Sequence, residues 1–234
     1  MTQKDMKAKV VAHGQVVVVM RGDGTTREYA IEGLPPDFIA WQIEARQALF
    51  QRLGSEPSIS TFAPHLPTLV TWGEGALFPN LAAKGMGLLP QDKLLEEYAI
   101  EFENLLAHLA NRPWPETMRE RVSAAQRFYG QAEAVDRRCL GGLEIFEGTT
   151  YRNLLSNPLA SLLYVGPGPR YRSFQLDCVV EVVAPGDPRY RFIRSIRGLF
   201  EHERFHYQQP DYPFGYVFWV VEARDKSLRV RGKG

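Results

Sequence analysis

The chain has 234 residues, of which 44% are hydrophobic and 24% are charged, and its formal net charge is +1. These values are ordinary for a globular protein. The near-neutral charge gives no general attraction to nucleic acid or to an anionic membrane surface. The length suits one large domain or two small ones.

Cysteine usage and apolar runs narrow the class of protein further. The two cysteines, Cys139 and Cys178, form no C-x-x-C motif and give no disulfide framework. The first ten residues are polar and charged, without the apolar segment of a signal peptide. The longest apolar run, Val16 to Met20, is too short to span a bilayer. The sequence therefore predicts a cytoplasmic protein with no nucleic-acid or membrane partner.

The first 60 residues predict a hairpin followed by a helix. Apolar segments at 8–19 and 26–31 flank Arg-Gly-Asp-Gly, and an Asp-Gly step between such segments is typical of a hairpin turn. Asp37 follows two prolines and suits the start of a helix that runs to about Leu53. We expect residues 1–60 to form an extension and residues 61–234 to form the main domain.

The next segment predicts a second hairpin and then a helical insertion. Residues 68–72 predict a strand, Gly-Glu-Gly a tight turn, and residues 76–83 the returning strand. Leucine and aromatic residues then recur at helical spacing from 94 to 109. After a Pro-Trp-Pro break, a second and more charged helix is predicted at about 116–129, so the insertion spans about 90–135.

From residue 140 onward strands dominate the prediction. They are expected at about 140–147, 159–165, 171–183, 214–223 and 227–231. A short helix at 150–156 and a longer one at about 187–205 interrupt them. Several strands with mixed connections and a few helices indicate an α+β or barrel architecture.

The segment from Gly148 to Leu154 predicts a helix start that suits a phosphate group. Unpaired N–H groups and the positive end of the helix dipole favour an anion there. Thr149 and Thr150 supply hydroxyl groups, and Arg152 supplies a planar guanidinium that matches phosphate oxygens. The alternative is an ordinary helix cap formed by either threonine, with Arg152 in solvent.

One long segment resembles the pyridoxamine-phosphate-oxidase-like, FMN-binding split barrels. It spans residues 148–183, GTTYRNLLSNPLASLLYVGPGPRYRSFQLDCVVEVV. The matching pattern begins with a hydroxyl residue, followed by Arg-Asn-Leu and then by Asn-Pro at the start of an apolar strand. A later strand ends in Glu-Val-Val, and a helix follows it. Residues 68–87, TLVTWGEGALFPNLAAKGMG, resemble the opening hairpin of such barrels, including the flavin-reductase-like branch. The resemblance implies an α+β split β-barrel of the Greek-key, mostly antiparallel kind.

The resemblance also implies a cofactor, a site and an assembly. The cofactor is FMN, with the deazaflavin F420 and haem as alternatives among relatives, and the protein is a homodimer acting on a small molecule. The implied cofactor-binding residues are Thr71, Trp72, Asn80, Thr149, Thr150, Arg152, Asn153 and Arg172. A flavin-dependent oxidoreductase is implied, and no catalytic acid or base is named because the flavin carries the chemistry.

Three of these residues have ordinary alternatives, and two other functions stay open. Asn80 also suits a strand-edge amide, Trp72 a core aromatic and Arg172 an exposed charge. Asp177-Cys178 departs from the glycine and small residue of many relatives, which is consistent with a non-catalytic barrel that binds no flavin.

The sequence His202-Glu203-Arg204-Phe205-His206 matches H-E-x-x-H, a zinc-hydrolase motif when both histidines share one helix face. The motif lies at the end of the predicted helix and close before Pro210. This position favours a charged, exposed helix end, so no metal site is predicted.

Overall fold

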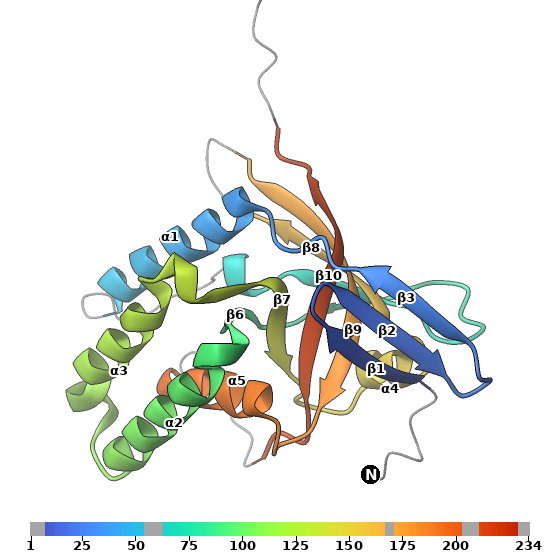
Figure 1. Cartoon of the computed structure of the whole chain (residues 1–234). Helices are drawn as coiled ribbons and strands as arrows, with labels where there is room; N and C mark the ends of the chain where they lie inside the picture. Colours follow the sequence, from blue (N-terminus) through green and yellow to red (C-terminus); the bar gives the residue numbers. More distant parts are fainter. Residues whose placement is uncertain (1–7, 54–62, 167–170, 203–210, 229–234) are drawn as a thin grey trace, which may run out of the picture.

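The computed structural model describes residues 8–53, 63–166, 171–202 and 211–228 (Figure 1). Its strands are β1 (Ala8–His13), β2 (Val16–Arg21), β3 (Thr26–Ala30), β4 (Thr68–Thr71), β5 (Asn80–Ala83), β6 (Met86–Pro90), β7 (Val135–Leu143), β8 (Leu159–Val165), β9 (Ser173–Val183) and β10 (Gly215–Asp225). Its α-helices are α1 (Pro36–Arg52), α2 (Asp92–Leu109), α3 (Trp114–Tyr129), α4 (Thr149–Ser156) and α5 (Pro188–Leu199). The strands form a three-stranded sheet, β1-β2-β3, and a seven-stranded sheet, β5-β4-β8-β9-β10-β7-β6.

The seven-stranded sheet is antiparallel at every pairing and curls on itself. β5 and β6 lie at its opposite edges, yet only Lys84 and Gly85 separate them in the sequence. A flat sheet of this size places its edge strands about 29 Å apart, whereas a two-residue link spans at most about 10 Å. The edges therefore have to meet, and residues 80–90 act as one bent strand that pairs with β4 and with β7. The predicted α+β split barrel is confirmed.

The N-terminal sheet follows from alternation along β2. Val17 and Val19 are buried, whereas their neighbours on β2 are only partly covered. Asp23 accepts two hydrogen bonds from Thr25 within the predicted turn between β2 and β3. The single strand expected at 8–19 is wrong, because Gly14 adopts a left-handed φ of 60° and turns the chain into a second hairpin.

Aromatic side chains join the N-terminal segment to the barrel. Phe38 of α1 packs edge-on against Tyr164 of β8 and Phe174 of β9, with ring centroids 4.9 and 5.4 Å apart. At the other contact, the Arg138 guanidinium donates to the Gly14 carbonyl at 3.3 Å and lies over the Trp219 ring. One apolar core therefore runs from the N-terminal segment into the barrel.

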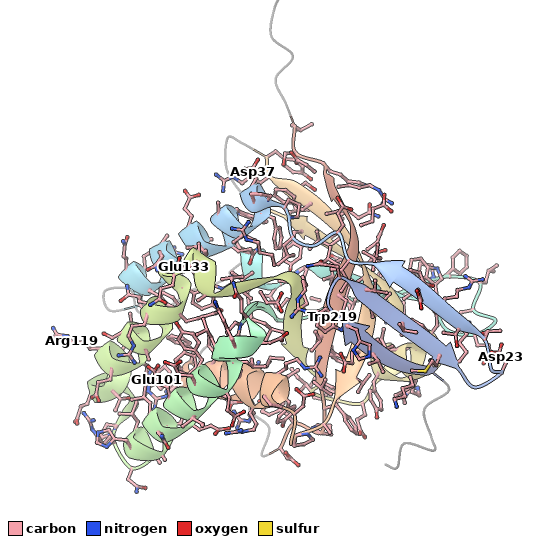
Figure 2. The ribbon with its side chains drawn as sticks, in the orientation of Figure 1. Asp23, Asp37, Glu101, Arg119, Glu133 and Trp219 are labelled. Atoms are coloured by element: carbon pink, nitrogen blue, oxygen red, sulfur yellow. The ribbon has the colours of Figure 1, made fainter. Side chains whose placement is uncertain are left out.

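The helices α2, α3 and α5 pack at one side of the barrel, opposite the N-terminal sheet (Figure 1). Phe102, Phe128 and Phe192, one from each helix, are fully buried against one another. Charged residues such as Arg119 lie on the outer side (Figure 2). The expected insertion is confirmed, since α2 and α3 connect β6 to β7. Among the described residues, no helix has the length and apolar character needed to cross a membrane.

Two strands have other bounds than predicted, and one strand was missed. β5 begins at Asn80 and not at 76, following Pro79, which has no N–H group for the strand ladder. β6 was not predicted, because five residues after a short link carry little periodicity. β7 spans 135–143 and not 140–147, since the Glu144 carboxylate binds the next two backbone N–H groups and the loop turns away.

The helix expected at 187–205 ends at Leu199. Arg121 of α3 donates to the carbonyls of Gly198 and Leu199 at 3.3 and 3.1 Å, which satisfies groups at the helix end. His202 lies beyond this helix, with its ring 5.1 Å from that of Trp114.

The zinc motif and the last expected strand fall largely outside the described residues. Residues 203–206 of the motif are not described, nor are residues 229–231 of the strand expected at 227–231. Residues 227 and 228 are described and lie in no strand. Among the described residues, no three His, Cys, Asp or Glu side chains are grouped so that they could hold a metal.

Candidate functional site

Four predicted site residues meet where β4, β5 and α4 come together. Thr71 ends β4 and Asn80 begins β5, and the two are register partners. Asn80 Nδ2 donates to Thr71 Oγ1 at 3.3 Å and to Thr150 Oγ1 at 3.0 Å. Asn153 Nδ2 donates to Thr71 Oγ1 at 3.1 Å. We call these four residues the Thr–Asn cluster.

The Thr–Asn cluster is buried, but its hydroxyl groups are incompletely paired. Thr71, Thr150 and Asn153 are 0%, 7% and 8% exposed. Both threonine oxygens act as acceptors, so each hydroxyl still has a proton to donate. Within the described part of the chain neither hydroxyl donates a hydrogen bond, and buried donors normally have an acceptor. The cluster therefore fits a ligand that presents acceptor atoms.

The start of α4 lies next to the cluster. Gly148 stands at its N-cap and has no side chain with which to cap the helix. The alternative in which Thr149 or Thr150 caps the helix is therefore not what the structure shows. Arg152 and Thr149 are exposed, and Arg152 Nη2 donates to Thr149 Oγ1 at 3.1 Å. The remaining guanidinium donors and the helix N–H groups are suited to an anion.

The two remaining predicted residues lie in different places. Trp72 follows Thr71 directly and is 40% exposed, so its indole is not a core side chain. Arg172 lies beyond Val165, whereas Thr71 pairs with the opposite end of β8. Arg172 Nη1 instead pairs with Glu44 of α1 at 3.1 Å. The structure therefore places Trp72 beside the cluster and does not bring Arg172 to it.

A buried ion pair near the cluster was missed in the sequence. Lys84 Nζ lies 2.5 Å from Glu144 Oε2, and the two side chains are 11% and 2% exposed. The same oxygen accepts from the Tyr216 hydroxyl at 2.5 Å. Glu144 Oε1 accepts from the backbone N–H groups of Ile145 and Phe146 at 3.0 and 2.8 Å. We call Lys84, Glu144 and Tyr216 the Glu144 hub; no motif or spacing links them.

The environment fixes the protonation states in the Glu144 hub. Burial tends to raise the pKa of Glu144, but attraction to Lys84 and hydrogen bonds from Lys84 and Tyr216 outweigh it and hold the pKa below its usual 4.5. Burial and the nearby carboxylate raise the pKa of Tyr216 far above its usual 10. At neutral pH the carboxylate is therefore ionised and the phenol keeps its proton to donate.

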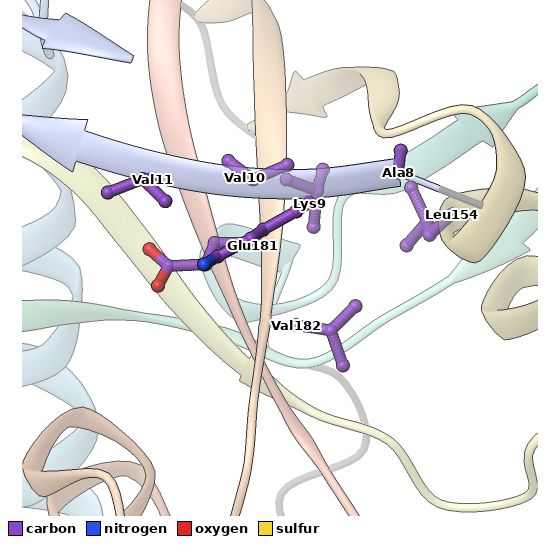
Figure 3. Close-up of a pocket in the computed structure, with 8 residues that line it drawn as sticks. Ala8, Lys9, Val10, Val11, Leu154, Glu181 and Val182 are labelled. Atoms are coloured by element: carbon purple, nitrogen blue, oxygen red, sulfur yellow. The ribbon is translucent and has the colours of Figure 1, made fainter. Parts of the chain in front are cut away.

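A cavity of about 210 Å³ lies where β1 passes across β9, with Leu154 of α4 in its lining (Figure 3). Its lining consists of Ala8, Lys9, Val10, Val11, Leu154, Val180, Glu181 and Val182. The Glu181 carboxylate already accepts from Arg189 and from the Trp219 indole N–H. The cavity contains no member of the Thr–Asn cluster, so it is separate from the candidate site.

No protein-family model and no curated protein matches the chain. Similar solved structures include HupZ from Group A Streptococcus, at 12% identity and TM-score 0.39, covering 69% of this chain and 85% of HupZ. They include a Listeria innocua protein assigned as a pyridoxamine 5'-phosphate oxidase, at 9% identity and TM-score 0.39, covering 77% and 97%. They also include HutZ, the heme storage protein of Vibrio cholerae, at 11% identity and TM-score 0.35, covering 78% and 94%.

Identities of 9–12% carry no statement about chemistry in this chain. The fold class rests on the strand order, and the site rests on its own contacts.

Proposed function

We propose that the protein binds FMN at the Thr–Asn cluster and the start of α4, and that it is a flavin-dependent oxidoreductase acting on a small molecule. The observation that carries this proposal is the Thr150 hydroxyl, 7% exposed and donating no hydrogen bond within the described part of the chain, beside a helix start with glycine at its N-cap and an exposed arginine. An acceptor-rich ligand with a negative charge matches all three features.

The proposal gives each residue a binding role. The N–H groups at the start of α4, the Thr149 hydroxyl and the Arg152 guanidinium hold the phosphate. The Thr–Asn cluster donates to acceptor atoms of the ligand, and the exposed Trp72 indole offers a flat apolar face to its ring. Bound FMN supplies the electron-transfer chemistry, and the chain supplies its orientation and shielding from water.

The donor set fits a flavin better than haem. Haem iron is held in proteins by histidine, cysteine, methionine or tyrosine, and the Thr–Asn cluster contains none of these. Two described histidines have neighbours elsewhere: His65 Nδ1 is 2.7 Å from the Met86 carbonyl oxygen, and His202 lies beside Trp114. F420 also carries a phosphate and fits the start of α4, so it stays an alternative to FMN.

A homodimer in the cytoplasm completes the proposal. Leu81 of β5 and Leu163 of β8 are 62% and 39% exposed, and both flank β4 on the outer side of the barrel. An apolar surface on a sheet favours a protein partner. Sedimentation equilibrium should give twice the chain mass; a single-chain mass at micromolar concentration would contradict the dimer.

The visible spectrum tests the cofactor directly. We expect the purified protein to be yellow, or the colourless protein to quench the fluorescence of added FMN as it saturates a site. Riboflavin, which lacks the phosphate, is the matched control and should bind much more weakly. A colourless protein that ignores FMN would exclude the proposal and support a non-catalytic barrel without flavin. If haem or F420 bound tightly in the same assay, that molecule would take the place of FMN as the proposed cofactor.

A further inference from the structure

We infer that Glu144, held by Lys84 and Tyr216, is a positioning residue that sets the start of α4 against Asn80. The inference deepens the proposed function. The part of its test that measures FMN affinity rests on that function. The sequence analysis assigned no role to any of the three residues. None of them belongs to the Thr–Asn cluster or to the start of α4.

The first argument is where the hub attaches. Lys84 follows Asn80 along the bent strand formed by β5 and β6, and Glu144 begins the loop that leads to Thr150. The same two segments meet again at the hydrogen bond of 3.0 Å between Asn80 and Thr150. The ion pair and this hydrogen bond therefore join one strand and one loop at two points, which fixes their relative position.

The second argument is the shape of the loop from 144 to 148. The Glu144 carboxylate holds its first two N–H groups, those of Ile145 and Phe146. Glu147 then adopts a left-handed φ of 46°, which is disfavoured for a residue other than glycine. Such a conformation persists only where the surrounding structure holds it. The hub supplies fixed contacts immediately before it, and Gly148 and α4 follow directly.

The third argument is the chemistry of the hub. A buried ion pair adds little net stability compared with apolar side chains of similar size, although loss of one partner is costly. Its bonds are directional, and here they reach three separate elements of the fold. Tyr216, which is fully buried on β10, ties the carboxylate to the barrel wall, and Lys84 lies 5.2 Å from the centre of the Tyr216 ring. These contacts are suited to fixing the position of the loop that precedes α4.

The test compares Glu144→Gln with the wild-type chain by two measurements. Glutamine keeps the size and one acceptor oxygen but removes the charge that holds Lys84. We expect amide hydrogen exchange in residues 152–156, whose N–H groups bond within α4, to become at least about tenfold faster, since local opening controls exchange. We also expect FMN affinity to fall about tenfold. Wild-type exchange in this segment would overturn the inference.

Asp136→Asn is the matched control. Asp136 lies at the opposite end of β7, is 5% exposed and pairs with Arg138 at 2.7 Å. This variant loses a buried charge from β7, the strand that leads into Glu144, so it reports the general cost of such a loss. It should leave exchange in residues 152–156 and FMN affinity unchanged. An equal effect of both variants would show a merely structural role and overturn the inference.

Two lysine variants keep the inference testable if Glu144→Gln fails to fold. Lys84→Arg retains the charge and should keep slow exchange in residues 152–156, whereas Lys84→Met should accelerate it. Equal exchange in the two variants would overturn the positioning role. Failure of the proposed function gives a different result, because the wild-type chain then does not bind FMN. The exchange measurement still decides whether Glu144 positions α4.

Discussion

Replacing Arg152 with alanine is expected to weaken FMN binding by about ten- to a hundredfold. Hydrogen bonds to a charged group contribute about 1.5–3 kcal/mol, and about 1.4 kcal/mol corresponds to a tenfold change in affinity. Arg152 is exposed, and among the described residues its side chain bonds only to Thr149 and to the Glu147 carbonyl, the latter at 3.5 Å. The fold should therefore remain intact. Quenching of FMN fluorescence during titration measures the dissociation constant.

Arg172→Ala is the matched control for this experiment. Arg172 was predicted for the same site, but it pairs with Glu44 at the other end of the β8–β9 hairpin. We expect its loss to leave FMN affinity unchanged, and exposed ion pairs of this kind contribute little to stability. Unchanged binding in Arg152→Ala would remove Arg152 from the phosphate site. An equal loss in Arg172→Ala would indicate a general effect of charge.

Replacing Phe192 with alanine is expected to lower the free energy of unfolding by about 3–5 kcal/mol, as for other buried phenylalanines. Phe192 of α5 is fully buried, and its ring centroid lies 5.7 Å from that of Phe102 and 5.2 Å from that of Phe128. Its removal opens a cavity where α2, α3 and α5 meet. Urea unfolding followed by circular dichroism measures the change.

Phe78→Ala provides the comparison for an exposed phenylalanine. Phe78 is 77% exposed in the loop before β5. Its loss leaves no cavity, so the free energy of unfolding should change by no more than about 0.5 kcal/mol. A small change in Phe192→Ala would contradict the packing of the three helices. A large change in Phe78→Ala would show that the exposed loop packs against something else.

Much of the local structure follows directly from the sequence. The Asp-Gly step gives the turn between β2 and β3, and the leucine and aromatic periodicity gives α2. Gly148 to Leu154 gives the start of α4, because a glycine followed by two threonines is typical of a helix start. The hairpin, the short helix and the long strands follow one another in the order typical of split barrels. This resemblance predicted the curled antiparallel sheet. Each of these signals depends on residues close together in the chain.

The assembly of the site depended on the tertiary structure. Thr71, Asn80, Thr150 and Asn153 were predicted singly, but their hydrogen bonds exist only because β5 and α4 meet at the end of β4. Register along β8 likewise decides that Arg172 lies at the far end of a hairpin.

The composition, the periodicity and the local turns thus determined the elements of this protein and the residue types at its candidate site. Only the closed sheet decided which of those residues touch. The Glu144 hub shows the limit most clearly, because Lys84 and Glu144 are 60 positions apart and neither carries a local signal. Their pairing follows from the bent strand that closes the barrel, and sequence periodicity holds no information about contacts over that distance.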